Sequence, residues 1–205
     1  MKKVEFFFDC SSPWTYLAFH RLQDIIKETR VNVYWRPILV GGVFNEVNQD
    51  VYNNRQNPNP FKFKYSRKDL QDWANFYQIA INWPDIFPLN AVNVMRGVIV
   101  ANSFEKLIPF SSSCFEAYWS KGTDISELGT LSKIAESIGI DKEEFNKKII
   151  HKDTKDLLRS NTDELINRGG FGSPTVFIDN DDMYFGNDRM ELIRNKILEE
   201  KNENK

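Results

Sequence analysis

Ser12 and Pro13 lie where the spacing of apolar residues changes from that of a strand to that of a helix. Residues 4–10 alternate across two faces, whereas apolar side chains between residues 16 and 26 recur at helical intervals. Serine is favoured at the N-cap of a helix and proline at its first position. Because a helix N-terminus presents unpaired N–H groups and a positive dipole end, an anion or a thiolate is favoured beside Ser12. The alternative is that Ser12 only caps the helix.

Two further segments carry residue types that are suited to binding a ligand. Residues 169–177, Gly-Gly-Phe-Gly-Ser-Pro-Thr-Val-Phe, precede a predicted strand, so they do not form the strand-to-helix glycine loop of a dinucleotide site. Since roughly one X-Pro bond in twenty is cis in folded proteins, the residues alone predict a trans bond before Pro174. Residues 186–189, Gly-Asn-Asp-Arg, predict a helix start that Asn187 caps and in which Asp188 favours the positive end of the dipole.

The elements that would position these residues follow one another in a clear order. Residues 31–37 alternate and predict a second strand, which closes a β-α-β unit. Residues 41–42, both glycine, predict a break, and residues 45–60, rich in Asn, Gln and Pro, predict a long loop. Strand patterns return as a hairpin over residues 175–185, and a final helix follows it.

Between about residue 66 and residue 168 the sequence predicts helices and no strand. Ser66 would cap the first helix and Asn90 would open another. Asp141 and Glu144 form a capping box for a later helix, and the last helix would end before Gly169. The predicted order is therefore β-α-β, a block of helices, then β-β-α. Both ends of the chain must join one sheet, because neither end alone has enough strands to cover a core.

The composition is that of a globular protein and excludes several functional classes. Of 205 residues, 41% are hydrophobic and 14% aromatic, and a net charge of −2 gives no electrostatic footprint for nucleic acid. No apolar run approaches the roughly 20 residues that span a bilayer, and the sequence lacks a signal-peptide cleavage pattern. We therefore expect a cytoplasmic protein without a membrane segment. Cys10 and Cys114 are too few for a disulfide framework, and with two histidines they do not predict a metal site.

Residues 7–18, Phe-Phe-Asp-x-x-Ser-Pro-x-x-Tyr-Leu-Ala, resemble the first strand and active-site turn of the 2-hydroxychromene-2-carboxylate isomerase family. That family is related to the kappa-class glutathione transferases and shares the fold of the bacterial DsbA-like disulfide oxidoreductases. The resemblance implies an α/β protein of thioredoxin-like fold with a large all-helical insertion. Residues 1–42 and 169–205 would form the thioredoxin-like domain, and residues 43–168 the inserted helical domain.

The same resemblance implies a glutathione site. Ser12 and Thr15 take the places of the two cysteines in the Cys-Pro-x-Cys of the oxidoreductases. Gly-x-Pro-Thr around Pro174 matches their cis-proline loop, and the backbone of Ser173 would pair with an extended peptide such as glutathione. Gly-Asn-Asp-Arg is similar to the family's Gly-x-Asp-Arg, in which Asp188 would meet the γ-glutamyl ammonium. The implied glutathione-binding residues are Ser12, Ser173, Pro174, Asn187, Asp188 and Lys62.

Two more segments, Pro-Phe-Lys-Phe-Lys-Tyr at residues 60–65 and Phe-Pro-Leu-Asn at residues 87–90, also resemble the family. Lys62 would meet a carboxylate of glutathione or of an aromatic acid substrate, and a lysine on an ordinary solvated face is the alternative. The candidate substrate-binding residues are Arg36, Tyr65 and Asn90.

The function that the resemblance implies is that of a glutathione-dependent isomerase. Ser12 would stabilise the thiolate of glutathione, which adds reversibly to an aromatic keto acid without a metal. A kappa-like glutathione transferase or peroxidase, acting on electrophiles or hydroperoxides, would use the same site. A dithiol oxidoreductase is disfavoured because Ser12 and Thr15 replace both thiols, and a serine hydrolase because His20 lies two helical turns from Ser12. Relatives are usually dimers, so we expect a homodimer.

Overall fold

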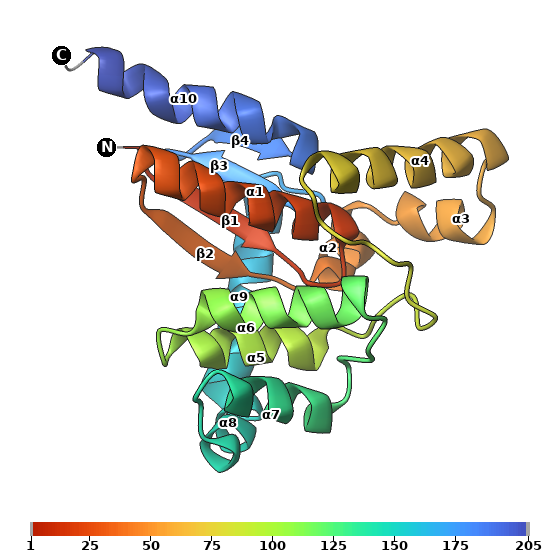
Figure 1. Cartoon of the computed structure of the whole chain (residues 1–205), viewed down its shortest axis with the longest axis vertical. Helices are drawn as coiled ribbons and strands as arrows, with labels where there is room; N and C mark the ends of the chain where they lie inside the picture. Colours follow the sequence, from red (N-terminus) through yellow and green to blue (C-terminus); the bar gives the residue numbers. More distant parts are fainter. Residues whose placement is uncertain (1, 204–205) are drawn as a thin grey trace.

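A four-stranded sheet of mixed direction, in the order β2-β1-β3-β4, forms the centre of the protein. The computed structural model describes residues 2–203 (Figure 1). β1 (Val4–Phe8) pairs in parallel with β2 (Val33–Pro37) and antiparallel with β3 (Thr175–Ile178), which forms a hairpin with β4 (Asp182–Phe185). The two ends of the chain therefore join in one sheet, as the sequence predicts.

The alternation along β1 divides the core between the two faces of the sheet. On one face Phe6 and Phe8 pack with Phe19 of α1 (Pro13–Thr29) and with Trp35 of β2. On the other face Phe7 packs with residues of α2 (Val40–Val47) and α9 (Lys152–Asn167) in a smaller cluster. α10 (Met190–Glu203) lies beside α1 and follows a short 3₁₀ turn at Asn187–Arg189.

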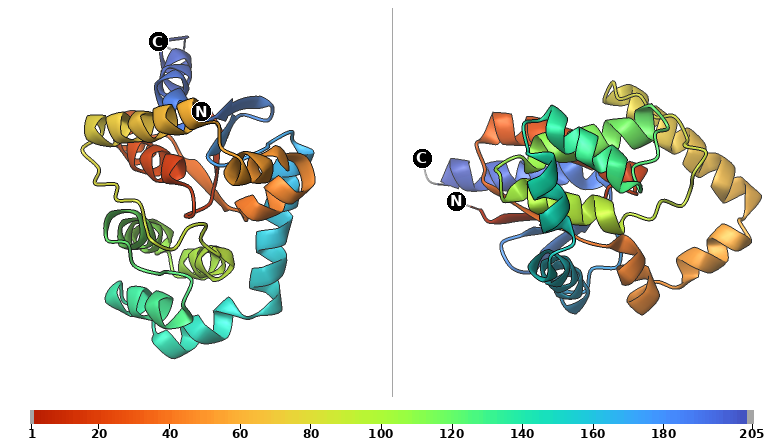
Figure 2. Two further views of the ribbon diagram at one scale, coloured as in Figure 1. Left: turned by 90° about the vertical axis from the view of Figure 1, so that its right-hand side faces the viewer. Right: turned by 90° about the horizontal axis from the view of Figure 1, so that it is seen from below.

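A layer of helices lies below the sheet in Figure 1. It contains α5 (Val92–Asn102), α6 (Leu107–Phe115), α7 (Leu128–Ser137) and α8 (Lys142–Ile149), and α6 continues as a π-helical turn at Glu116–Ser120. Figure 2 shows how α9 then carries the chain from this layer back to the sheet. No strand occurs between β2 and β3 in the part of the chain that the structure describes, which confirms the predicted order of elements. No helix within residues 2–203 is both long and apolar enough to cross a membrane.

The long loop predicted at residues 45–60 is wrong. α2 runs through the predicted break at residues 41–42, and α3 (Asp50–Gln56) and α4 (Pro60–Phe76) follow closely. Gly42 faces α9, and a Cβ atom at this position would lie 3.3 Å from the side chain of Thr162. The absence of a side chain therefore lets α2 approach α9 closely. The Asn and Pro residues that suggested a loop instead start α4, whose first turn is capped by Asn59.

The helix starts predicted from capping residues have mixed outcomes. Ser12 caps α1, and Asp141 caps α8 by accepting a hydrogen bond of 2.8 Å from the Glu144 N–H. Ser66 is not a cap, because α4 begins six residues earlier at Pro60. Asn187 makes no side-chain cap either, although a helical turn does begin there. The division into residues 1–42 with 169–205 and residues 43–168 stays a prediction, and α2 runs across the first of these boundaries.

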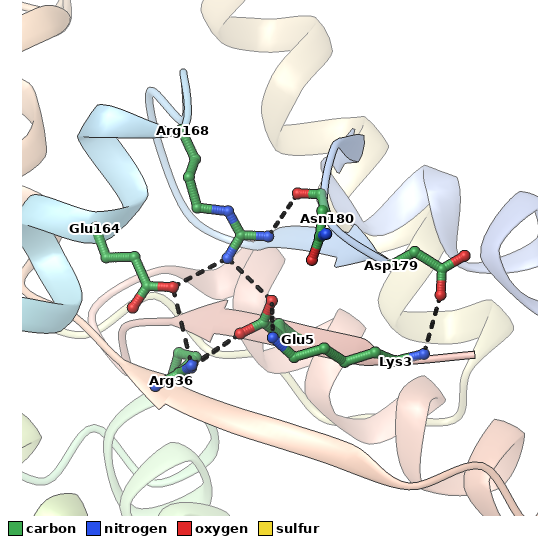
Figure 3. Close-up of polar contacts among 7 residues, drawn as sticks. All are labelled: Lys3, Glu5, Arg36, Glu164, Arg168, Asp179 and Asn180. Atoms are coloured by element: carbon green, nitrogen blue, oxygen red, sulfur yellow. Dashed lines mark hydrogen bonds and ion pairs between the residues drawn. The ribbon is translucent and has the colours of Figure 1, made fainter. Parts of the chain in front are cut away.

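Glu5 projects from β1 on the same face of the sheet as Phe7, where its side chain is fully buried among cations (Figure 3). Arg36 of β2 donates to Glu5 Oε1 at 3.2 and 2.9 Å, and Arg168 donates to Oε2 at 3.0 Å. Lys3 lies 3.1 Å from Oε2, and Glu164 of α9 accepts a bond of 3.1 Å from Arg168. Burial by itself raises the pKa of Glu5, but these cations outweigh it and hold the pKa below its ordinary value of 4.5.

Arg168 extends this network to the β3–β4 turn. Its guanidinium donates a bond of 2.8 Å to the Asn180 C=O and lies 3.8 Å from the centre of the Phe177 ring. Asp179, in the same turn, accepts a bond of 3.2 Å from the Lys3 N–H (Figure 3). One buried carboxylate therefore connects the first strand to the second strand, to α9 and to the hairpin.

We predict that Glu5→Gln lowers the free energy of unfolding at pH 7 by about 3 kcal/mol, because two partly buried arginines lose their shared anion. Since the folded-state pKa of Glu5 is depressed, the stability it contributes is present above the unfolded-state pKa and is lost as the pH falls through the folded-state value. Urea unfolding from neutral to acidic pH measures this: wild type and variant should differ at pH 7 and converge in acid.

The matched control is Glu28→Gln, which removes the anion from an arginine pair at the surface, that of Glu28 with Arg194. It should change stability much less than Glu5→Gln does, because exposed pairs contribute little. A deficit for Glu5→Gln that stayed constant across the pH range would contradict the prediction.

Candidate functional site

Ser12 occupies the turn between β1 and α1. Its Oγ accepts a hydrogen bond of 3.3 Å from the Thr15 N–H, which is the expected helix cap, and donates one of 3.3 Å to the Ser173 C=O. The Ser12 N–H donates to the Asp9 C=O at 3.3 Å. The side chain of Ser12 is half-buried, so it remains within reach of a ligand at the helix N-terminus.

The peptide bond between Ser173 and Pro174 is cis. The resemblance implies this isomer, whereas the residues alone predict a trans bond. The loop around it is fastened to the Ser12 turn by two bonds to the Ser173 hydroxyl. The Asp9 N–H donates to Ser173 Oγ at 3.0 Å, and the Thr15 hydroxyl lies 2.8 Å from the same oxygen. Thr15, which takes the place of a second cysteine, is fully buried and serves this contact.

Asp9 connects the turn to α2. Its carboxylate is completely buried, with Oδ1 accepting from the Ser11 N–H and Oδ2 from the Val40 N–H, both at 2.8 Å. Burial raises the pKa of Asp9, and the two backbone bonds counteract part of that rise. Val40 is the first residue of α2, so this carboxylate sits at a helix N-terminus, where a negative charge is favoured.

One cavity, of about 590 Å³, opens beside the cis-proline loop. We call it the cis-proline cavity. Its lining residues are Trp14, Tyr65, Asp69, Trp73, Ser173, Pro174, Phe185, Gly186, Asn187, Asp188 and Arg189. The structure thus brings together four of the six predicted glutathione-binding residues, Ser173, Pro174, Asn187 and Asp188, although they come from separate loops. Tyr65, predicted for the substrate, lines this same cavity.

Asn187, in the wall of this cavity, has a side-chain hydrogen-bond donor without a partner. The residue is 4% exposed, and its Nδ2 has no hydrogen-bond partner among the described residues. A buried donor without a partner costs free energy, so a carboxylate or carbonyl placed against it would bind favourably. Asp188 and Arg189 add exposed charges of both signs, 3.3 Å apart. The cavity therefore suits a ligand that carries both an ammonium and carboxylates.

A second cavity, of about 330 Å³, opens beside Asp9 and Ser11, and we call it the aromatic cavity. Its remaining walls are Leu39, Val40, Gly41, Gly42, Phe44, Asn45, Tyr52, Arg55, Phe87, Pro88, Leu89, Asn90, Ala91 and Val92. Asn90, predicted for the substrate, lies here. Phe44, Tyr52 and Arg55 are not among the predicted site residues, because the Asn-, Gln- and Pro-rich composition of residues 45–60 predicts a loop and Phe44 directly precedes it. Their spacing on two short helices was the signal that could have revealed them.

Three predicted site residues line neither cavity: Ser12, which lies in the turn that contacts both, Arg36 and Lys62. The Arg36 guanidinium is bound to Glu5 on the face of the sheet under α9, and it lines neither cavity. The structure therefore corrects the expectation that Arg36 meets a substrate carboxylate. Lys62 is exposed in the first turn of α4 and also lines neither cavity, which agrees with the alternative of a solvated lysine.

Cys10 is not an alternative nucleophile. It is fully buried, its C=O accepts a bond of 2.9 Å from Trp119 Nε1, and its N–H points at the Met95 sulfur at 3.3 Å. Burial raises the pKa of the Cys10 thiol well above its ordinary value, and nearby Cys114 and Asp9 raise it further. The thiol thus stays protonated and serves packing. Within the described residues no group of His, Cys, Asp and Glu side chains is arranged to hold a metal ion.

The Ser12 turn lies between the two cavities. Its Oγ contacts the loop that lines the cis-proline cavity, and its N–H contacts Asp9, which lines the aromatic cavity. A thiol held at one side of Ser12 could therefore meet a second molecule held at the other. The two cavities therefore lie near one helix N-terminus.

Comparisons with known proteins agree with this architecture. 2-Hydroxychromene-2-carboxylate isomerase from Sphingobium xenophagum is 26% identical, over 97% of this chain and 99% of that protein. Glutathione S-transferase kappa 1 from Homo sapiens is 29% identical, over 97% of this chain and 92% of the relative. A solved structure of a 2-hydroxychromene-2-carboxylate isomerase has a TM-score of 0.83 at 25% identity and covers 98% of this chain and 97% of its own. The profile of the DSBA-like thioredoxin domain matches residues 3–198, and the chain belongs to that family.

Proposed function

We propose that the protein is a glutathione-dependent isomerase of the 2-hydroxychromene-2-carboxylate type, acting on an aromatic keto acid. The observation that carries the proposal is the position of Ser12, a hydroxyl at a helix N-terminus between two cavities. Similarity to 2-hydroxychromene-2-carboxylate isomerases along almost the whole chain, in sequence and in structure, supports the reaction type.

Glutathione fits the cis-proline cavity by the chemistry of the residues there. The unpartnered Asn187 amide would donate to a carboxylate of the γ-glutamyl end, and Asp188 would accept from its ammonium. The backbone of Ser173, beside the cis bond to Pro174, would pair with the extended peptide. Ser12 would then stand next to the sulfur.

When bound, glutathione supplies a thiol that in its ionised form can add to an electrophilic carbon and leave again, which allows a double bond to isomerise. A free thiol has a pKa of about 8.5, so the protein must favour the ionised form at neutral pH. Ser12 Oγ–H can donate to an anion by giving up its bond of 3.3 Å to the Ser173 C=O, which is long and therefore weak. Lowering a thiol pKa by one unit requires about 1.4 kcal/mol, which one hydrogen bond to a charged group supplies.

A kappa-like glutathione transferase or peroxidase is the second candidate function. The human kappa 1 relative, 29% identical over 97% of this chain, favours it, and the same cis-proline cavity would serve it. The two functions differ in the molecule that the aromatic cavity accepts. Conjugation of a chlorinated aromatic electrophile faster than isomerisation of 2-hydroxychromene-2-carboxylate would select the transferase, and the reverse order would select the isomerase.

The cytoplasmic location and the homodimer expected from the sequence stay proposals. We predict a sedimentation coefficient in velocity centrifugation that corresponds to two 24.0 kDa chains and does not change with dilution across the micromolar range. A single species of one chain's mass at every concentration would contradict the homodimer.

We predict that Asn187→Ala weakens glutathione binding by roughly 10- to 100-fold, because the ligand loses a hydrogen bond to a charged group. Isothermal titration with glutathione measures the change. Asn195→Ala, on the exposed surface of α10 and outside both cavities, should bind glutathione as the wild type does. Equal affinity of Asn187→Ala and wild type would remove Asn187 from the site.

The role of Ser12 has its own test. Ser12→Ala should cost about 0.5–2 kcal/mol of stability through the lost cap, and it should also raise the pKa of bound glutathione and lower turnover at neutral pH. Turnover should partly recover as the pH rises, because solvent then deprotonates the thiol. The measurement is a pH–rate profile at saturating glutathione.

Asp141→Ala is the matched control for this experiment. It also removes a helix cap, that of α8, but far from both cavities. Its pH–rate profile should coincide with that of the wild type while its stability falls by a similar amount. If Ser12→Ala also kept the wild-type profile, Ser12 would be a cap with no part in the reaction.

A further inference from the structure

We infer that the outward face of α4 is the surface on which a second copy of this chain docks, with the two α4 helices antiparallel across a two-fold axis. The inference rests on the proposed homodimer and adds to it the place where the two chains meet. The surface consists of Phe61, Tyr65, Asp72 and Phe76, and we call it the α4 stripe.

α4 has little packing within its own chain. Of its 17 residues only Leu70 and Ala74 are buried, and every residue from 60 to 68 is exposed. In Figure 1 this first half of the helix extends past the end of α1. A helix of this length is marginal in water unless an apolar face is covered by other parts of the structure. A further covering surface is therefore expected for α4.

The α4 stripe is the apolar face that such a surface would cover. Phe61, Phe76 and Tyr65 are 84%, 73% and 65% exposed. At about 100° per residue, the four members of the stripe lie within about 60° of one another around the helix axis. The buried residues Leu70 and Ala74 lie on the opposite side of the helix. Contiguous exposed apolar residues of this kind mark interaction sites.

The α4 stripe is complementary to a second copy of itself. Phe61 and Phe76 are equally distant from the point between residues 68 and 69, and the same holds for Tyr65 and Asp72. Two copies of α4 that cross antiparallel at that point place Phe61 beside the partner's Phe76. They also place the Tyr65 hydroxyl beside the partner's Asp72, whose carboxylate can accept its proton in a hydrogen bond. Because the contact is two-fold symmetric, each pair forms twice.

The charges on α4 favour the same antiparallel arrangement. Lys68, near the middle of the stripe, pairs with Asp72 one turn further along its own helix. In the antiparallel pair each Lys68 lies between two Asp72 carboxylates, its own and the partner's. A parallel pair would place like charges at the same level, which is repulsive. Asp72, one turn from Phe76, also disfavours an anionic lipid surface as the occupant of the stripe.

A partner docked in this way would border the cis-proline cavity. Tyr65 belongs both to the stripe and to the lining of that cavity, and Asp69 and Trp73, one and two turns further along α4, line the cavity as well. A partner helix laid along the stripe therefore lies against the same wall from outside. The second chain would shield this wall from water and contribute to the shape of the cavity.

The test is sedimentation velocity of wild type, Phe61→Glu, Phe76→Arg and the double variant. Each single substitution places an unpaired charge against an aromatic ring of the partner at two symmetric positions, so the dimer dissociation constant should rise by about 100-fold or more. In the double variant the two opposite charges meet across the interface, and the dimer should largely return. Within one chain positions 61 and 76 lie about 22 Å apart along the helix, so such a rescue can arise only between chains.

Ile150→Glu is the matched control. It also places a charge on an apolar residue, which is 62% exposed but lies outside α4 and both cavities, so this variant should sediment as the wild type does. Circular dichroism checks that every variant keeps the helix content of the wild type. Single variants that form dimers as tight as those of the wild type would overturn the inference and leave the homodimer with another interface. A double variant that dissociates as the single variants do would also overturn it.

The wild type itself separates this inference from the proposals on which it rests. A wild type that sediments as one chain at every concentration would refute both the homodimer and this surface. If that single chain cosedimented with phosphatidylglycerol vesicles and Phe61→Glu did not, the stripe would be a membrane-binding surface instead. None of these measurements requires turnover, so the isomerase proposal stands or falls by its own assay.

Discussion

The site depends on the polar groups of one residue, Asp9, at the end of the first strand. Its N–H binds the hydroxyl of Ser173, its C=O accepts from Ser12, and its two carboxylate oxygens hold the Ser11 turn and the start of α2. Three of the segments near the two cavities, namely the Ser173 loop, the Ser12 turn and the start of α2, are thereby held by one residue. A buried carboxylate is tolerated only when its oxygens are satisfied, so the three segments must come together in one arrangement.

A comparable constraint acts within β1, where Glu5 is surrounded by cations on the face that packs against α9. Glu5 lies within β1 and Asp9 directly follows the strand, and the two acids have different partners. Glu5 secures the sheet to α9 and to the β3–β4 hairpin, whereas Asp9 secures the loops of the site. The stability of the fold and the geometry of the site thus rest on separate charges, and the arginines near Glu5 are not available to a ligand.

The sequence predicted the parts of this protein that depend on local signals. The change of period at Ser12, the helix cap at Asp141 and the strand hairpin each have a physical cause within a few residues, and each is present in the structure. The cis bond before Pro174 could not follow from local preference and came from the resemblance. The partner of Arg36 was not predicted, because Glu5 lies on another strand and the register between two strands does not follow from a local pattern.

The aromatic cavity was missed for a related reason. The glycines of α2 and the amide-rich segment after it have low intrinsic helix preference, and tertiary packing of α2 against α9 overrides that preference. Once those residues are helical, Phe44, Tyr52 and Arg55 face one cavity with Phe87. Propensity alone contains no information about such an assembly.

The walls of the two cavities come from different stretches of the chain. The cis-proline cavity is built from α4 and the loops around Ser173 and Asn187, and the aromatic cavity largely from residues 39–55 and 87–92. Substitutions can therefore accumulate in one wall set while the other, together with the shared serine turn, keeps its shape. With such a layout, proteins that share this scaffold can differ in the molecules that one cavity accepts and still keep the same serine turn.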